Sequence, residues 1–256
     1  MKTHKTSPLV VITRPKLQSV SWLEAFQAEG FLALAFPTLE IEQLYQERLP
    51  VGWLALLQTA DLILITSPNS IYCAPDEVKA CLKDKESQLI SMGKGTTQAL
   101  VENHIKAAYT SPDGSTSEDL LNYPFFQSPE ILQKTIVLLS GEGGRTKLLD
   151  VLKQRGAAVH KLALYRRILP KNLMPQDFKW EQNRPYIFVI TSLTALEHLQ
   201  ILCPPEFLPW LQQQTFVVIS TRIFEGAKQA GFHQVVNTHG MDLAKIVQAV
   251  KACYPT

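Results

Sequence analysis

Two apolar runs, each ending in Ile-Thr-Ser, divide the chain into similar halves. Residues 62–65 precede Thr66-Ser67, and residues 187–190 precede Thr191-Ser192. The two phrases lie 125 residues apart in a chain of 256. Continuous apolar runs of this length are typical of strands that are buried on both faces of a parallel sheet. The spacing therefore predicts two copies of one α/β unit.

The other expected elements repeat in the same order. In the first copy, apolar runs predict further strands at residues 9–12, 31–36, 88–92 and 107–109. In the second copy, the corresponding strands are expected at residues 136–140, 158–164, 216–219 and 234–236. The first helix of each copy is expected to end at Gly30 and at Gly156, which lie 126 residues apart. This alternation predicts an α/β fold made of two similar parallel-sheet domains with helices on both faces.

Two extended segments follow the second strand of each copy. Residues 37–42 alternate between polar and apolar side chains, and residues 164–170 form the counterpart. Both read as connectors, whereas residues 124–129 read as a turn-rich junction between the copies. The repeat alone does not exclude a simple division into two domains near residue 128.

Composition narrows the class of protein. The hydrophobic content of 46% is ample for two cores, and the charged fraction of 19% argues against long disordered segments. The net charge of +2 comes without a basic stripe, so we expect no nucleic-acid partner. No apolar stretch approaches the ~20 residues of a membrane helix. The four cysteines have no Cys-x-x-Cys spacing. We therefore expect a cytoplasmic protein with reduced thiols and no membrane partner.

Hydroxyl side chains and glycines gather where the predicted strands end. In open parallel sheets, ligands bind beyond the carboxyl ends of the strands. Helix N-termini with free N–H groups attract anions, although Ser, Thr and Asn are also the commonest helix caps. This edge is poor in acids and histidines, so a ligand with several carboxylates or phosphates suits it. The candidate binding residues are Thr13, Arg14, Thr66, Ser67, Asn69, Gly93, Thr96, Ser140, Thr191, Ser192, Thr194 and Thr221.

Several familiar motifs do not fit the sequence. The run of residues 141–145 lacks the spacing of a dinucleotide-binding loop, and residues 93–96 lack the upstream glycine of a phosphate loop. No nucleophile elbow and no histidine pair at metal-ligand spacing occurs, so we expect neither an α/β-hydrolase nor a metal site. Tyr165 is either a packed tyrosine or a proton donor, because a phenol stays protonated at neutral pH and can donate to a leaving group.

Six segments, in order along the chain, resemble the uroporphyrinogen-III synthase family. They are residues 11–15 (VITRP), 36–41 (FPTLEI), 65–70 (ITSPNS), 92–97 (MGKGTT), 141–145 (GEGGR) and 164–167 (LYRR). The ordered set is more specific than any single segment, and it covers nearly the whole chain. The resemblance implies two α/β domains joined by a two-stranded connector. It assigns residues 1–36 and 170–256 to the first domain, 41–164 to the second, and 37–40 and 165–169 to the connectors.

The resemblance also implies a reaction. The family dehydrates and closes hydroxymethylbilane, a linear tetrapyrrole with eight carboxylates, and inverts ring D in an interdomain cleft. The family needs no cofactor, serves heme biosynthesis and is expected to be monomeric, with at most a transient contact to the enzyme that supplies the bilane. By matching motif, Tyr165 corresponds to the family's candidate proton donor.

The matching motifs assign cleft positions in both domains. In the first half of the chain they are Thr66, Ser67, Asn69, Gly93 and Thr96, and in the second half they are Thr191, Ser192 and Thr194. The chain departs from the family at residues 220–223, where Ile223 occupies the position of a frequent threonine. Thr221 is an alternative source of that hydroxyl.

Two other interpretations remain. The departure at Ile223 leaves room for a non-catalytic module of two lobes that binds a small anionic ligand. A pair of phosphotransfer receiver-like domains fits less well, because such domains need an acidic cluster at the strand ends and the sequence has none there.

Overall fold

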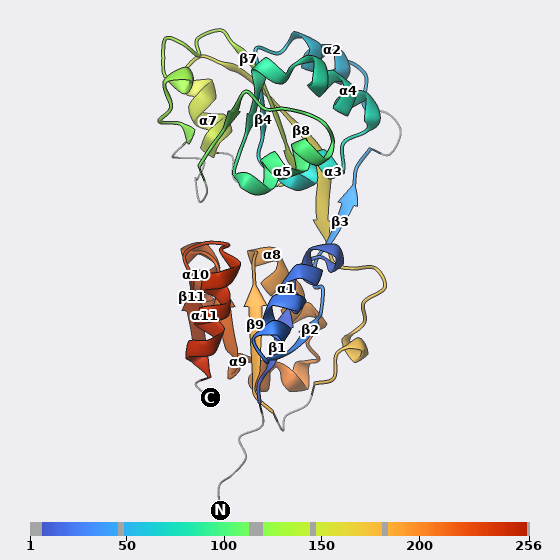
Figure 1. The fold of residues 1–256 in the computed structure, drawn as a ribbon, viewed down its shortest axis with the longest axis vertical. Helices are drawn as coiled ribbons and strands as arrows, with labels where there is room; N and C mark the ends of the chain where they lie inside the picture. Colours follow the sequence, from blue (N-terminus) through green and yellow to red (C-terminus); the bar gives the residue numbers. More distant parts are fainter. Residues whose placement is uncertain (1–6, 46–48, 113–119, 144–146, 181–183, 255–256) are drawn as a thin grey trace, which may run out of the picture. The chain divides into compact units, whose positions relative to one another are not determined.

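Two sheets built mainly of parallel strands form the framework of the protein (Figure 1). The computed structural model describes residues 7–45, 49–112, 120–143, 147–180 and 184–254. The chain divides into two compact units. Unit 1 comprises Met1–Glu40 and Ile168–Thr256, and unit 2 comprises Ile41–Arg167.

Unit 1 holds a five-stranded sheet in the order β11-β10-β9-β1-β2, and every neighbouring pair is parallel. Its strands are β1 (Leu9–Ile12), β2 (Leu32–Ala35), β9 (Tyr186–Ile190), β10 (Thr215–Val218) and β11 (Gln234–Asn237). Its helices are α1 (Lys16–Ala28), α8 (Leu193–Leu202), α9 (Leu208–Gln212), α10 (Thr221–Gln229) and α11 (Leu243–Cys253), with 3-10 turns at Pro175–Asp177 and Pro205–Phe207.

The central strands of unit 1 are buried on both faces, as their apolar runs predict. Val11 of β1 packs in a core with α8 and α10. Val10 and Ile12, which point to the opposite face, pack in a second core with α1 and α11. The helices therefore cover both faces of the sheet, which confirms the predicted fold class.

Unit 2 holds a six-stranded sheet in the order β3-β8-β7-β4-β5-β6. Four neighbouring pairs are parallel, and β3 runs opposite to β8 in Figure 1. Its strands are β3 (Glu40–Gln43), β4 (Leu62–Ile65), β5 (Leu89–Ser91), β6 (Tyr109–Thr110), β7 (Thr135–Gly141) and β8 (Ala158–Ile168). Its helices are α2 (Trp53–Thr59), α3 (Pro68–Tyr72), α4 (Asp76–Asp84), α5 (Lys94–Glu102) and α7 (Lys147–Gln154), with 3-10 turns at Glu86–Gln88 and Pro124–Phe126.

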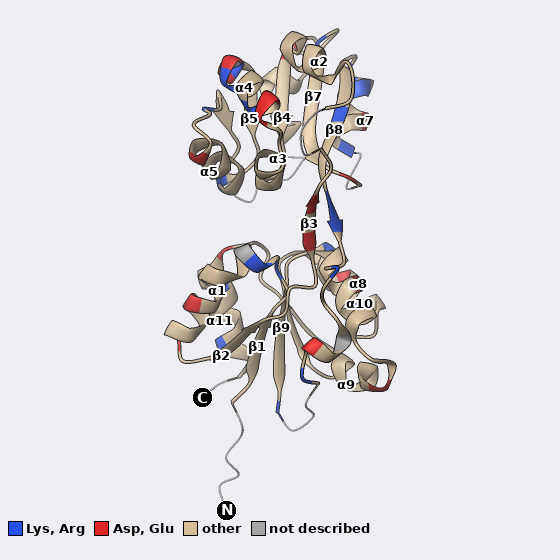
Figure 2. Cartoon of the chain, turned by 90° about the vertical axis from the view of Figure 1, so that its right-hand side faces the viewer, with Lys and Arg blue, Asp and Glu red and all other residues tan. Residues whose placement is uncertain are grey.

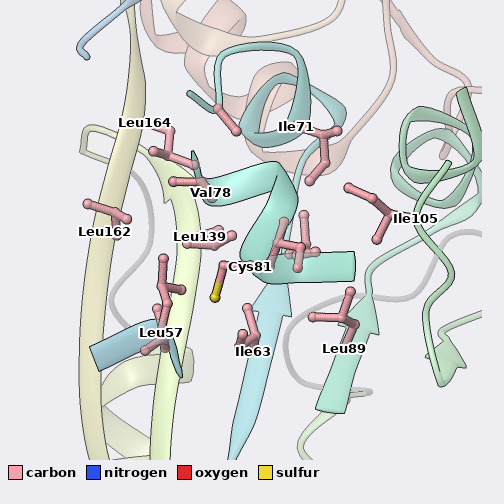
Figure 3. Packing of buried hydrophobic residues seen from close by; sticks show 14 of the residues in the cluster. Leu57, Ile63, Ile71, Val78, Cys81, Leu89, Ile105, Leu139, Leu162 and Leu164 are labelled. Carbon is pink, nitrogen blue, oxygen red and sulfur yellow. The ribbon is translucent and has the colours of Figure 1, made fainter. Parts of the chain in front are cut away.

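The sheet of unit 2 also separates two cores. Ile63 of β4 packs with Leu57, Cys81 and Leu139 on the face that α2 and α4 cover (Figure 3). Leu64, the next residue of β4, packs on the other face with α7. Alternation of one apolar run between two cores is the reason that the run carries no polar residue.

Each sheet contains strands from both halves of the sequence. β1 and β2 of the first half pair in unit 1 with β9, β10 and β11 of the second half. In unit 2, β7 and β8 of the second half pair with β4, β5 and β6 of the first half. Each unit thus contains the opening strands of one copy and the closing strands of the other.

The chain crosses between the units twice, between Glu40 and Ile41 and between Arg167 and Ile168. Both crossings fall in neighbouring strands, because β3 pairs with β8. The Leu44 N–H donates to the Leu164 carbonyl at 3.0 Å, and Arg166 forms an ion pair with Glu42. Figure 2 shows the acidic residues of β3 beside the basic end of β8. Backbone and side-chain contacts therefore hold the two strands of the connector together.

Burial keeps the thiols protonated. The four cysteines are free, and burial raises the pKa of Cys203 to about 11. Among the described residues, no helix is long and apolar enough to span a membrane.

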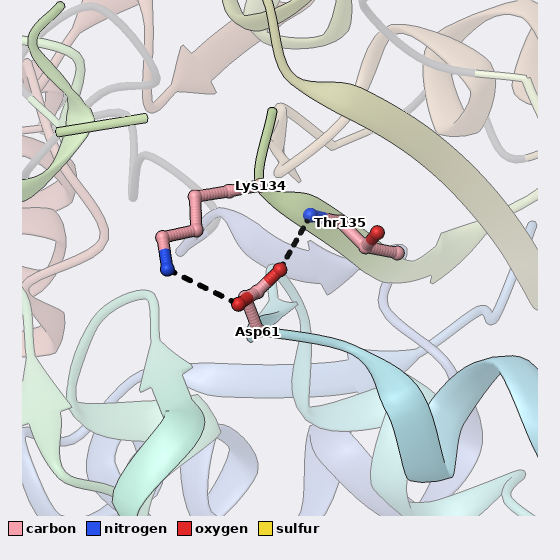
Figure 4. Close-up of polar contacts among 3 residues, drawn as sticks. All are labelled: Asp61, Lys134 and Thr135. Atoms are coloured by element: carbon pink, nitrogen blue, oxygen red, sulfur yellow. Dashed lines mark hydrogen bonds and ion pairs between the residues drawn. The ribbon is translucent and has the colours of Figure 1, made fainter. Parts of the chain in front are cut away.

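Asp61 fixes the starting edge of the two central strands of unit 2 (Figure 4). Its backbone N–H donates to the Thr135 carbonyl at 2.9 Å, and its carboxylate accepts from the Thr135 N–H at 2.8 Å and from Lys134 Nζ at 3.2 Å. The pKa of Asp61 lies below its ordinary value, chiefly because the Thr135 N–H binds the charged form.

We predict that Asp61→Asn lowers the free energy of unfolding by about 0.5–1 kcal/mol at neutral pH, since the carboxylate is largely exposed. A carboxyl whose pKa is depressed on folding binds fewer protons in the folded chain, so its stabilisation is present above pH ~4 and is lost as the pH falls below that value. Urea unfolding at pH 7 and pH 3 measures this. Glu29→Gln is the control, because Glu29 pairs with Lys251 on the surface. An Asp61→Asn deficit that is equal at both pH values would contradict the assignment.

Candidate functional site

The strand order of each sheet defines one position where a ligand crevice is expected. In unit 1 the chain leaves β1 toward β2 on one side, and leaves β9 toward β10 on the other. In unit 2 the corresponding reversal lies between β7 and β4. In open parallel sheets, ligands bind at such switch points, beyond the carboxyl ends of the strands. Thr13 and Thr191 follow β1 and β9, and Thr66 follows β4.

At the switch point of unit 1, Thr13 and Arg14 have different roles. Thr13 is fully buried, and both its N–H and its hydroxyl donate to the Val189 carbonyl, the hydroxyl at 2.9 Å. Its hydroxyl hydrogen is therefore used within the sheet. Arg14 lies over the ring of Trp22 at 4.4 Å and donates to Gln18 at 3.0 Å.

The Arg14 guanidinium still has donor capacity. Its Nε is buried and has no hydrogen-bond partner among the described residues. Burial lowers the pKa of Arg14, but an arginine remains charged at neutral pH. A buried unpaired donor is costly, so this atom is suited to an anionic ligand.

At the switch point of unit 2, Thr66 bonds to the neighbouring strand as Thr13 does in unit 1. The N–H of Thr66 donates to the Leu139 carbonyl at 3.3 Å, with its hydroxyl at 3.4 Å. The buried Ser70 hydroxyl donates to the same carbonyl at 3.2 Å. The contacts of Thr66 and Ser70 hold β4 and β7 together where the strands end. Ser140, the penultimate residue of β7, is also buried, and its hydroxyl donates to the Gly141 carbonyl.

Ser67 and Ser192 are helix caps. Ser67 Oγ accepts from the Asn69 N–H at 3.3 Å at the start of α3, and Ser192 Oγ accepts from the Ala195 N–H at 3.1 Å at the start of α8. The capping alternative is thus confirmed for both. Capping uses a lone pair and leaves the hydroxyl hydrogen available, because a serine both donates and accepts. Both serines are partly exposed, so each can cap a helix and bind an anion.

The turn after β5 presents a different hydroxyl from the expected one. Gly93 adopts a left-handed φ of 76°, and the side chain of Thr96 is buried. The partly exposed hydroxyl belongs to Thr97, which lies 2.7 Å from Ser91 Oγ and 3.1 Å from Thr110 Oγ1. Thr97 also lines a shallow depression of about 400 Å³ with Lys94, Gly95, Gln98, Val101 and Thr110.

Tyr165 is buried at the carboxyl end of β8, with 1% of its surface exposed. Ser140 pairs with Ala163, but Gly141 pairs with Tyr165, so β8 contains one extra residue at this point. Such a bulge bends a strand and redirects its side chains. Leu164 and Tyr165, which lie at this bulge, are both buried.

The bulge is fixed from both sides. The Tyr165 carbonyl accepts from the Glu142 N–H at 2.7 Å, and the Leu164 carbonyl accepts from Leu44 of the connector. The ring of Tyr165 lies directly over Gly141, where a Cβ atom would come within 2.7 Å of the ring carbon Cζ. The Tyr165 hydroxyl accepts from Arg167 Nη2 at 3.0 Å.

The remaining candidates lie in the first turns of helices or, for Thr191, just before a helix. Asn69, Thr191 and Thr194 are partly exposed, and Thr221 is exposed at the start of α10. In the described part of the chain, no three His, Cys, Asp or Glu side chains are grouped closely enough to hold a metal ion.

Comparisons with known proteins agree with this arrangement. The family model for uroporphyrinogen-III synthase HemD matches residues 20–248. The chain belongs to the uroporphyrinogen-III synthase family.

Relatives in this family align over most of their length. The uroporphyrinogen-III synthase of Escherichia coli is 24% identical over 94% of this chain and 99% of its own. That of Proteus mirabilis is 29% identical over 62% of this chain and 80% of its own.

Solved structures from the family share the fold. The uroporphyrinogen-III synthetase from Helicobacter pylori aligns with a TM-score of 0.67 and 13% identity, over 96% of this chain and 99% of its own. A mutant uroporphyrinogen III synthase from Thermus thermophilus aligns with a TM-score of 0.60 and 18% identity, over 96% and 98% of the two chains.

The departure from the family pattern at Ile223 has a structural consequence. Ile223 is buried in the core between α10 and the sheet, with 4% of its surface exposed. Its N–H is capped by Ser220 Oγ at 3.4 Å. The side chain therefore contributes packing and no hydroxyl, and Thr221 is the exposed hydroxyl of this turn.

Sequence reasoning missed two residues beside Tyr165. Gly141 belongs to a glycine-rich run that is most simply read as a loop, yet it lies in β7 and makes room for the tyrosine ring. Arg167 is the second of two adjacent arginines, and only the structure shows which of them reaches the phenol. Gly144 and Arg145 lie outside the described residues.

We predict that Gly141→Ala destabilises the protein by about 1–3 kcal/mol, because the new methyl group forces the Tyr165 ring to move. Gly95→Ala is the matched control. A Cβ at Gly95 meets Pro68 at an ordinary 3.7 Å, and the residue lies in α5. The same substitution there is expected to be neutral or stabilising by up to about 1 kcal/mol. Chemical unfolding of both variants measures the difference, and equal effects would contradict the close packing at Gly141.

Proposed function

We propose that this protein converts hydroxymethylbilane to uroporphyrinogen III, with loss of water and inversion of ring D. The observation that carries the proposal is the family match over residues 20–248. The polar groups at both switch points support it. The partly exposed hydroxyls of Ser67 and Ser192 and the unpaired Nε of Arg14 are donors suited to carboxylates.

In this proposal, binding and chemistry are separate tasks. The substrate is reactive, so holding it in one geometry supplies most of the acceleration. The donors Arg14, Ser67, Asn69, Thr191, Ser192, Thr194 and Thr221 bind its carboxylates. Thr13 and Thr66 instead use their hydroxyl hydrogens within the sheets, and the N–H of Gly93 donates to Ser111 Oγ. Thr96 and Ser140 are buried. Tyr165 acts as the acid that protonates the departing hydroxyl group.

The wider assignments follow from the family. The reaction is a cyclising dehydration in tetrapyrrole and heme biosynthesis. We propose that the protein acts in the cytoplasm as a monomer and uses no cofactor. Its partner is the small-molecule substrate, with at most a transient contact to the enzyme that supplies it.

A non-catalytic module that binds a small anionic ligand is the second candidate. The observation that favours it is Ile223, which fills a core position where the family often has a threonine. This module would use the same strand-end donors without the acid.

The isomer of the product decides between the two candidates. Purified protein is mixed with freshly generated hydroxymethylbilane, and the porphyrins are separated after oxidation. We expect the type III isomer, because unassisted closure gives type I. Boiled protein is the control, and type I alone in both samples would support the binding module.

We predict that Tyr165→Phe lowers kcat for type III formation by about 10²–10⁴, which is the usual contribution of a positioned acid. Tyr186→Phe is a matched control. Tyr186 is also buried, and its hydroxyl donates to the Lys179 carbonyl in unit 1. Its loss should cost about 1 kcal/mol of stability and leave kcat unchanged. Full activity of a folded Tyr165→Phe protein would remove the acid from the proposal.

A further inference from the structure

We propose that Arg167 is a positioning residue, which holds the phenol of Tyr165 with its hydrogen available to the substrate. The inference rests on the proposed function of Tyr165 as the acid. It assigns a role to a residue that does not itself touch the reacting atoms.

The first step is the direction of the hydrogen bond. Arg167 Nη2 lies 3.0 Å from the Tyr165 hydroxyl, and the guanidinium carbon lies 5.2 Å from the ring centroid. A guanidinium has donors only, so the phenol oxygen must accept. The phenol hydrogen is not used in this contact, and no described residue accepts it. It is therefore free to donate to a group that reaches the buried phenol.

The second step is the restriction of the ring. The Tyr165 side chain is buried, lies over Gly141 and follows a bulge that is fixed by Glu142 and Leu44. A ring with this packing cannot turn its oxygen away from Arg167 without moving the backbone. One lone pair of the oxygen is thus bound to Arg167 before a ligand arrives. The hydrogen and the other lone pair remain for the ligand.

The third step is the charge that develops during the reaction. When the C–O bond of the hydroxymethyl group breaks, the Tyr165 proton goes to the departing oxygen and water leaves. The tyrosine becomes a phenolate. Arg167 is a positive donor already in contact with this oxygen, so it stabilises the new negative charge more than it stabilises the neutral phenol. Ring closure later releases a proton from the attacking pyrrole carbon, and this proton restores the phenol.

The neighbouring arginine offers a contrast. Arg166 and Arg167 are consecutive in β8, so their side chains leave the strand on opposite sides. Arg166 forms its ion pair with Glu42 of β3. Loss of Arg166 removes the same charge from the same strand without touching the phenol.

A double-mutant cycle tests the proposal with type III formation as the readout. Arg167→Ala should lower kcat about 10- to 10²-fold with KM changed less than about threefold. Arg167→Lys should recover part of the loss, since it retains a charged donor. In the Tyr165→Phe protein, Arg167→Ala should have no further effect beyond about twofold, because no oxygen remains to accept. Arg166→Ala should keep the kcat of the parent, and thermal unfolding verifies that every variant is folded.

The possible results separate the inference from the proposed function. Equal losses in both backgrounds, or a rise in KM alone, would show that Arg167 acts elsewhere and would overturn the inference. A slow Tyr165→Phe protein with a fully active Arg167→Ala protein would overturn the inference and keep the acid. A fully active Tyr165→Phe protein would overturn both.

Discussion

Hydrogen bonding between strands from opposite halves of the chain is the constraint on which the rest of the structure depends. β1 pairs with β9 in unit 1, and β4 pairs with β7 in unit 2. Parallel strands cannot be joined by a tight turn, so each pairing requires long crossovers that place helices on the faces. All strands of the parallel ladder then end at one edge, and polar residues that follow them collect there. The exchange between halves also forces the chain to cross between units twice, through β3 and β8.

The central strands of unit 2, β4 and β7, are joined by different side chains at their two ends. At the starting edge of unit 2, Asp61 joins β4 to β7 through the Thr135 N–H. At the finishing edge, Thr66 joins the same strands through the Leu139 carbonyl. This hydrogen bond fixes the separation of β4 and β7 at their carboxyl ends. The partly exposed donors that follow these strands are therefore held at a fixed spacing. A precise spacing of donors is what a catalyst that acts by orientation requires.

The sequence predicts the strands well because a strand buried on both faces must be apolar throughout. Residues 9–12 and 62–65 match β1 and β4 residue for residue. It predicts the edge where the polar residues gather, but not which of two adjacent residues faces a ligand. Thr13 is buried while Arg14 keeps an unpaired donor, and Thr96 is buried while Thr97 is partly exposed. These choices depend on strand register and helix phase, which tertiary packing sets. The bulge at Leu164 and Tyr165 depends on β3 and β7 together, so no local pattern reveals it.

The hydroxyls and N–H groups at the strand ends have a physical advantage in the proposed reaction. The bilane and its macrocycle carry the same carboxylates, so a set of lysines would bind both about equally and would not favour closure. Hydroxyls and N–H groups form short, directional hydrogen bonds, so they stabilise only carboxylates that lie in the correct positions. A charged donor is of further use where the reaction itself creates charge. Arg167 beside the Tyr165 oxygen is such a place, because its contribution grows in the step in which the proton moves.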